Sequence, residues 1–312
     1  MSAFLALPPV MRIMAVTAAV LIAASVLVAV LRRARPAADF GELEARVRSW
    51  WVMASVFFAA ILVDARISLV FFGLLSFWAL KEYVTLLETR PADHRALFWA
   101  FLAVPAQYYL VWIGWYGMFV LFIPVYMFLF LPLRLVIAGQ PQGFVRSASH
   151  LQWGLMAFVF GLSHLGALLR FAEPLPGPGV DGRTLVLFLV FVTEMSDVLQ
   201  YAWGKLFGRH KILPTISPNK TWEGFVGGVL SASALSLLVR FLTPFPVWET
   251  LVVSFLICVV GFFGGAVMSA VKRDLGTKDF GSLIPGHGGV LDRVDSLCYS
   301  APVFFHYVRF FH

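Results

Sequence analysis

The chain has 312 residues, of which 60% are hydrophobic and only 13% are charged, with a net charge of +7. Soluble globular proteins carry about 25% charged residues, so this composition, with a mean hydropathy of +0.84, excludes a soluble domain and predicts several membrane-spanning helices. In such a protein the positive charge is typical of cytoplasmic loops and does not by itself indicate nucleic-acid binding.

The first half of the chain predicts six membrane spans. The apolar run at residues 10–31 is long enough to cross a bilayer and is followed by further spans, so we interpret it as a retained helix rather than a cleaved signal peptide. It ends at the basic cluster Arg32, Arg33 and Arg35. The other spans of this half are predicted at about residues 50–63, 67–87, 96–112, 115–136 and 151–171.

The segment 173–183 divides the chain in two. Its 3 prolines and 3 glycines predict an irregular loop between an N-terminal multispan region, 1–172, and a C-terminal region, 184–312. The fold class is therefore all-α, a polytopic membrane bundle of about 9–10 transmembrane helices with functional loops in the cytoplasm. The spans of the second half are predicted at about residues 184–203, 222–242, 248–271 and 296–311.

Lysine and arginine indicate the orientation. Placing the loop 32–49 in the cytoplasm puts the loops 88–95, 134–149, 204–221 and 272–295 on the same side, and these hold most of the remaining basic residues. Both ends of the chain then lie outside. The two loops with unusual chemistry, 204–221 and 272–295, face the side where nucleotides and magnesium are found.

Two acids interrupt the predicted span 184–203. Glu194 and Asp197 are three residues apart and therefore share one face of a helix. Each carboxylate in hydrocarbon costs at least about 2.5 kcal/mol, which favours a face turned toward a polar cavity. The alternative is that both acids lie near the cytoplasmic end of the helix and simply reach water.

The loop 204–221 has the composition of an anion-binding segment. Four bases and a Ser-Pro-Asn-Lys-Thr run precede the next span, and the amides and dipole of a helix N-terminus favour phosphate. The alternative is a basic loop that only sets topology. The candidate ligand-binding residues here are Lys205, Ser217, Asn219, Lys220 and Thr221.

The stretch 269–295 concentrates four acids, four bases and five glycines between two apolar segments. The amides of Gly288 and Gly289 could cradle phosphate oxygens, and Asp292 and Asp295 share a helix face as hard oxygen ligands that suit magnesium. His287 is explained as well by hydrogen bonding within the loop as by catalysis. Interfacial ion pairing is the alternative for the whole stretch, whose bases are Lys272, Arg273, Lys278 and Arg293.

These residues resemble the signature of a known family. The pattern is similar to that of the phosphatidate cytidylyltransferases, or CDP-diacylglycerol synthases, over about residues 197–295. The N-terminal half matches that family only as a hydrophobic multispan segment. The matching residues read Ser217-Pro-x-Lys220-Thr-Trp-Glu-Gly224 and Ser269-x2-Lys272-Arg273-x4-Lys278-Asp279-x-Gly281-x2-Ile284-Pro285-x-His287-Gly288-Gly289-x2-Asp292-Arg293-x-Asp295.

The resemblance implies a reaction and its setting. Phosphatidate, or a similar lipid phosphate, would attack the α-phosphorus of CTP to give CDP-diacylglycerol and pyrophosphate, with magnesium at the leaving group. The enzyme would be integral to a bacterial cytoplasmic membrane with its active site on the cytoplasmic face. It would contact membrane lipid and no nucleic acid. A second, monovalent cation and a homodimer are left open.

Roles follow from the residues and the resemblance together. We expect catalysis from Lys220, Lys272, Arg273, Asp279, His287, Asp292 and Asp295. Substrate binding is expected from Ser217, Asn219, Thr221, Lys205, Lys278, Gly288, Gly289 and Arg293. Magnesium is expected at Asp292, Asp279, Asp197 and Glu194.

The sequence departs from the family pattern at a metal-binding carboxylate. Where the family carries this aspartate the chain has Gly265, a usual glutamate is Met268, and a usual alanine in the span 184–203 is Gln200. Two other hypotheses therefore stay open: a related nucleotidyl transferase with another lipid-phosphate acceptor, and an inactive or transport-type membrane protein on the same scaffold. The acids that could replace the missing ligand are Glu194, Asp197 and Asp279.

Overall fold

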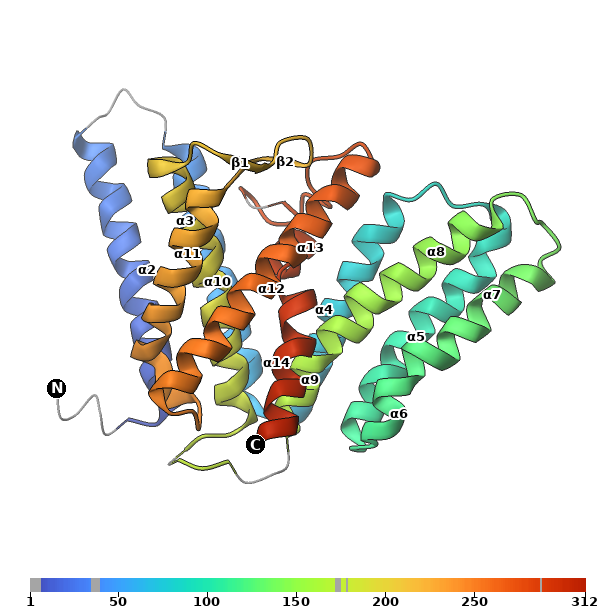
Figure 1. The fold of residues 1–312 in the computed structure, drawn as a ribbon, viewed down its shortest axis with the longest axis horizontal. Helices are drawn as coiled ribbons and strands as arrows, with labels where there is room; N and C mark the ends of the chain where they lie inside the picture. The colour runs from blue at the N-terminus through green and yellow to red at the C-terminus, as the bar shows by residue number, and fades with distance from the viewer. Residues whose placement is uncertain (1–6, 35–39, 172–174, 178, 287) are drawn as a thin grey trace.

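The computed structural model describes residues 7–34, 40–171, 175–177, 179–286 and 288–312, and these are mostly helical (Figure 1). The first half contains α2 (Pro9–Ala34), α3 (Gly41–Val63), α4 (Ala65–Thr85), the 3-10 turn η1 (Pro91–Asp93), α5 (His94–Trp112), α6 (Tyr116–Leu121), the π-helical η2 (Phe122–Met127), α7 (Phe128–Ile137), α8 (Phe144–Gly154), the π-helical η3 (Leu155–Gly161) and α9 (Leu162–Leu169). The second half contains α10 (Gly182–Phe207), β1 (Lys211–Leu213), β2 (Ser217–Thr221), α11 (Trp222–Leu235), the 3-10 segment η4 (Ser236–Leu242), α12 (Val247–Asp274), α13 (Leu291–Val294) and α14 (Leu297–Phe311).

Eight of the described helical segments are long and apolar enough to cross a membrane. This confirms the predicted polytopic integral membrane bundle. The predicted spans 96–112 and 296–311 correspond to α5 and α14. These two helices pack in the same bundle but do not reach that combination of length and apolar character, so the prediction of about 9–10 spans is higher than eight. The eight segments are α2, α3, α4, α6–α7, α8–α9, α10, α11–η4 and α12.

The helices α10, α11, α12 and α14 form the middle of the bundle, with α2 and α5–α8 on its two flanks (Figure 1). The β hairpin, the end of α12 and the end of α2 lie at one end of the molecule. The start of α2 and the end of α14 lie at the other. The arrangement agrees with the predicted topology, in which the segments 204–221 and 272–295 share one side of the membrane.

The segment 204–221, predicted as a loop, is partly regular. The helix α10 continues to Phe207, and the residues after it form an antiparallel hairpin in which Lys211 pairs with Thr221. The Thr221 hydroxyl then accepts a hydrogen bond from the Gly224 amide at 3.1 Å. This N-cap begins α11 directly after β2, so the hairpin is held close to the helical bundle.

The segment 272–295 also begins as a helix. The helix α12 continues to Asp274, so Lys272 and Arg273 lie on its last turn rather than in a loop. Basic side chains are favourable there because the carbonyl end of a helix carries partial negative charge. The position of both bases is therefore fixed by the apolar packing of α12.

The two predicted halves share one core. The helix α9 packs against α4 of its own half and against α10 and α14 of the second half. The buried apolar side chains form a single cluster that runs through both. The boundary at 173–183 stays a prediction, since part of that segment lies outside the described residues.

Candidate active site

A cavity of about 500 Å³ lies where α3, α10, β2, α12 and the segment after α12 meet. Pockets for small molecules and cofactors are typically about 300–1,000 Å³. Aromatic walls come from Trp50, Tyr201, Phe225 and Phe262. The polar side chains that line it are Arg46, Glu194, Asp197, Gln200, Asn219, Lys220, Thr221, Ser269, Asp292, Arg293, Asp295 and Ser296.

The acids of α10 meet the acid that follows α13 through one serine. The Ser296 hydroxyl donates to Asp197 Oδ2 at 2.9 Å, and the Ser296 amide donates to Asp295 Oδ1 at 2.7 Å. Glu194 lines the same cavity, one turn from Asp197 on the same face of α10. The structure therefore brings together carboxylates that are about a hundred residues apart in the sequence.

Lys220 lies beside the position that lacks the family carboxylate. Its ammonium donates to the Phe262 carbonyl at 3.3 Å and sits 4.3 Å from the centre of the Phe262 ring. A Cβ atom added at Gly265 would lie 3.2 Å from Lys220 Nζ. Burial lowers the pKa of Lys220, while Asp197 and Asp295 act in the opposite direction. A half-buried cation therefore lies beside Gly265, the position at which the family resemblance implies an aspartate.

Asp292 holds the glycine-rich loop together. Its Oδ1 accepts from Lys272 Nζ at 2.8 Å, and its Oδ2 accepts from the amides of Phe280 at 2.8 Å and Gly289 at 2.9 Å. The side chains of Lys272 and Asp292 are only 14% and 3% exposed, so each needs the other. A Cβ at Gly288, where φ is +83°, would come within 2.7 Å of Asp292 Oδ2, so the loop requires glycine there.

Glu82 of α4, which the sequence analysis did not select, anchors the same loop from the first half of the chain. Its carboxylate accepts from the amides of Val290 at 3.0 Å and Leu291 at 2.8 Å, 208 and 209 positions away. These amides begin the helical segment α13, so Glu82 caps it and complements its dipole. The one signal in the sequence was an acid inside the predicted span 67–87, whose burial requires a partner.

We expect Glu82→Gln to lower the melting temperature of the purified protein. The change keeps the shape of the side chain but removes the carboxylate that accepts hydrogen bonds from both amides. Hydrogen bonds to charged groups contribute about 1.5–3 kcal/mol. Glu88→Gln is the matched control, because the Glu88 side chain is 83% exposed. Equal melting temperatures for the two variants would contradict the anchoring role of Glu82.

Several predicted site residues lie outside the cavity lining. Arg273 donates to the carbonyl oxygens of Ile216 at 3.3 Å and Thr277 at 3.0 Å, which joins α12 to the hairpin. Lys205 is exposed on the last turn of α10. The others that do not line the cavity are Ser217, Lys272, Lys278, Asp279, Gly288 and Gly289, while His287 lies outside the described residues.

The start of α11 is occupied by groups of the chain itself. Thr221 caps it, and Glu223 in its first turn accepts from the Arg209 amide at 3.0 Å. The phosphate-binding role predicted for this helix N-terminus stays a prediction. The side chains of Asn219 and Lys220 instead line the cavity from the hairpin.

Magnesium suits part of the acid set. Among the described residues, no group of three or more His, Cys, Asp or Glu side chains is placed to hold a metal ion. Asp279 does not line the cavity, and both oxygens of Asp292 already hold the loop. Asp197 and Asp295, with Glu194 nearby, remain as oxygen donors. Since magnesium commonly takes one or two carboxylates plus substrate phosphates, this set fits an ion that arrives with a nucleotide.

The fold and the site define an integral membrane protein with a polar cavity of mixed charge at the hairpin side of a helical bundle. Residues 44–311 match the model of the cytidylyltransferase family, and the chain belongs to that family. It is 44% identical over 272 residues to the uncharacterized protein YnbB of Escherichia coli (strain K12), which covers 86% of this chain and 88% of that protein. The family resemblance seen in the sequence is thereby confirmed.

Relatives with a named activity match over shorter regions. The phosphatidate cytidylyltransferase of Mycobacterium leprae is 40% identical over 172 residues, which cover 54% of this chain and 53% of that protein. That of Staphylococcus haemolyticus is 39% identical over 125 residues, which cover 39% of this chain and 48% of that protein. The matched region spans about half the length of each of these two relatives.

Proposed function

We propose that the chain transfers the cytidylyl group of CTP to phosphatidate, giving CDP-diacylglycerol and diphosphate on the cytoplasmic face of a bacterial membrane. The proposal is supported most by the cavity, in which acids of α10 and of the segment after α13 meet cations of β2, α3 and α13. Family membership and the named activity of the shorter-matching relatives support the reaction class. Most of the lining comes from the region 184–312, which we propose is catalytic.

The cations of the cavity suit the phosphates of a nucleotide. Lys220 approaches from β2, Arg46 from α3 and Arg293 from α13. The Nε atom of Arg293 is buried and has no hydrogen-bond partner among the described residues, so it is a donor that a ligand could satisfy. Arginine and lysine bind phosphate oxygens with charge-assisted hydrogen bonds. These three side chains would hold the nucleotide so that its α-phosphorus faces the acceptor.

The transfer itself needs positioning and charge neutralisation. An oxygen of the lipid phosphate forms a new bond to the α-phosphorus of CTP, and the bond from that phosphorus to the bridging oxygen of diphosphate breaks. Asp197 and Asp295 would hold magnesium, which neutralises charge on diphosphate when it is bound. The nearby spans allow a lipid phosphate to approach from the bilayer while CTP enters from the cytosol.

The test is incorporation of radiolabelled CTP into lipid by the purified protein with magnesium and phosphatidate. We expect labelled CDP-diacylglycerol and equimolar diphosphate, with both lost on addition of EDTA. The acceptor panel should include lysophosphatidate and a polyprenyl phosphate, and CTP binding should be measured by calorimetry. A protein that neither binds CTP nor labels any acceptor would rule out the enzymatic function.

A transferase with another lipid-phosphate acceptor is the second candidate. It is favoured by the departures near the cavity, where Gln200 lines the wall and donates to Ser196 at 2.7 Å. The likeness to the named phosphatidate cytidylyltransferases also covers less of the chain than the likeness to the uncharacterized YnbB, so the acceptor has to be tested directly. A higher kcat/KM with the polyprenyl phosphate than with phosphatidate would establish this candidate in place of the first.

We expect Gly265→Asp to lower the magnesium concentration needed for half-maximal activity by about tenfold, because even changes around metal ligands alter affinity about 10–100-fold. The position accepts a side chain, since the nearest atoms to a new Cβ are the mobile end of Lys220 at 3.2 Å and Ser296 Oγ at 3.5 Å. Calorimetric titration with magnesium in the presence of CTP gives the affinity directly. Gly265→Asn is the neutral control of equal size, and an equal gain in both variants would contradict a new carboxylate ligand.

A further inference from the structure

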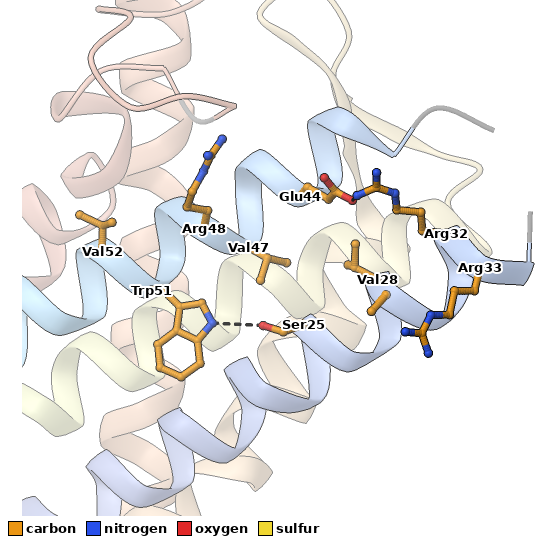
Figure 2. Close-up of a pocket in the computed structure, with 10 residues that line it drawn as sticks. Ser25, Val28, Arg32, Arg33, Glu44, Val47, Arg48, Trp51 and Val52 are labelled. Carbon is orange, nitrogen blue, oxygen red and sulfur yellow. Dashed lines mark hydrogen bonds and ion pairs between the residues drawn. The ribbon is translucent and has the colours of Figure 1, made fainter. Parts of the chain in front are cut away.

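A second cavity lies between α2 and α3, away from the candidate active site (Figure 2). Its volume is about 700 Å³. The side chains of Val28 and Val47 face it from the two helices, and Ala29 and Val52 extend the apolar lining. The residues of α3 that line the active-site cavity, Arg46 and Trp50, do not line this one, so α3 separates the two spaces.

The groove has a hydrogen bond between its two helices toward the inner end and charged side chains toward its outer end (Figure 2). Trp51 Nε1 donates to Ser25 Oγ at 3.1 Å and ties the helices together at the inner end, while Arg32 and Glu44 form an ion pair at 3.0 Å near the outer end. The distance from Ser25 to Arg32 along α2 is about 10 Å at 1.5 Å per residue. The groove therefore fits within one leaflet of a hydrocarbon core that is about 30 Å thick.

The outer end carries excess positive charge. Arg33 of α2 and Arg48 of α3 also line the groove, Arg33 near the Arg32–Glu44 pair and Arg48 nearer Trp51 (Figure 2). Neither has a hydrogen bond or ion pair with another described residue, and the one acid of the lining, Glu44, is already paired. Basic pockets between transmembrane helices on the cytoplasmic side suit anionic head groups.

We propose that this groove binds one anionic phospholipid of the cytoplasmic leaflet. An acyl chain lies along Val28 and Val47, and the phosphate lies at the outer end beside Arg33, with Arg48 adding positive charge from α3. A basic cluster that only sets topology needs no cavity beside it, whereas here bases without partners among the described residues line an apolar groove. The site is separate from the catalytic cavity, so the proposal does not depend on the proposed reaction.

The experiment is native mass spectrometry of the purified protein released from nanodiscs of phosphatidylglycerol or of phosphatidylcholine. We expect wild-type protein to retain one phosphatidylglycerol and no phosphatidylcholine. In a titration with phosphatidylglycerol, Arg33→Ala/Arg48→Ala should bind at least about tenfold more weakly, since each base near an anionic lipid surface contributes roughly a fivefold preference. Arg95→Ala is the matched control, because Arg95 is an exposed base near the same side that does not line the groove.

A second variant keeps the charges and fills the groove. Ala29 is exposed on α2, so Ala29→Trp places a large ring into the groove without disturbing the core, and it should remove the retained lipid. Unchanged retention in both variants, or equal retention of phosphatidylcholine by the wild-type protein, would overturn the proposal. A groove that instead seats a second copy of the chain would show Ala29→Trp converting dimer to monomer with lipid retention unaffected, which also overturns it.

Discussion

Replacing Lys220 with alanine is expected to slow cytidylyl transfer by about 10²–10³-fold, the usual effect of removing one charge-stabilising donor from an active site. The ammonium group of Lys220 extends from the hairpin into the cavity that Asp197 and Asp295 also line, and it lies beside Gly265. Its contacts with the Phe262 carbonyl and ring are weak, so the melting temperature should change little. The measurement is kcat/KM for CTP, with the melting temperature as a check on folding.

Lys211→Ala is the matched control for this change. Lys211 is an exposed base on the other strand of the same hairpin and does not line the cavity, so its loss alters the charge of the hairpin without altering the site. Wild-type kcat/KM is expected for Lys211→Ala. If both variants lose activity equally, the hairpin acts through its overall charge and the specific role of Lys220 is wrong.

The pH dependence gives an independent check on Lys220. Burial lowers its pKa below that of an exposed lysine, although Asp197 and Asp295 oppose the shift. Only the protonated side chain attracts phosphate, so activity should fall as the pH rises through this lowered pKa. Lys220→Arg stays charged throughout and should move the alkaline limit of activity to higher pH, even though its maximal rate is lower. If Lys220→Arg loses activity at the same alkaline pH as the wild-type protein, a group other than Lys220 causes that loss.

The membrane bundle could be predicted because its cause is local. Each apolar run of about 20 residues satisfies its own backbone hydrogen bonds as a helix, so composition and length suffice. The grouping of Glu194 with Asp197 also follows from helical spacing alone. The hairpin β1–β2 could not be predicted in this way, because both strands are short, β2 is polar, and neither strand alternates apolar and polar residues.

The details of the candidate site depend on contacts between distant segments. Nothing in the sequence near Glu82 indicates that it would cap a helix more than 200 positions later. The contacts of Asp292 could not be predicted from the sequence either, because a carboxylate that binds a metal and one that accepts hydrogen bonds from loop amides have the same sequence context. The predicted roles of these side chains therefore remain predictions, and mutation must separate structure from chemistry.

Asp292→Asn is expected to destabilise the protein by about 3–5 kcal/mol, the usual result of breaking a buried ion pair, and to abolish measurable activity. One amide oxygen could still accept from Phe280 and Gly289, but the amide nitrogen would then face the buried ammonium of Lys272. The melting temperature and the rate of thermal inactivation measure the loss. Asp279→Asn is the control for stability, because Asp279 is exposed.

The double variant Lys272→Met/Asp292→Asn separates the two roles of Asp292. Methionine removes the unpaired ammonium while keeping the length of the side chain, so most of the lost stability should return, as when a buried pair is replaced by apolar groups. If Asp292 also takes part in the chemistry, the double variant stays inactive although its stability and its loop are restored. Recovery of activity to within about tenfold of wild type would show that Asp292 only holds the loop, because removing a group needed in the transition state costs about 10²–10³-fold. The acids left to bind magnesium would then be Asp197, Asp295 and Glu194.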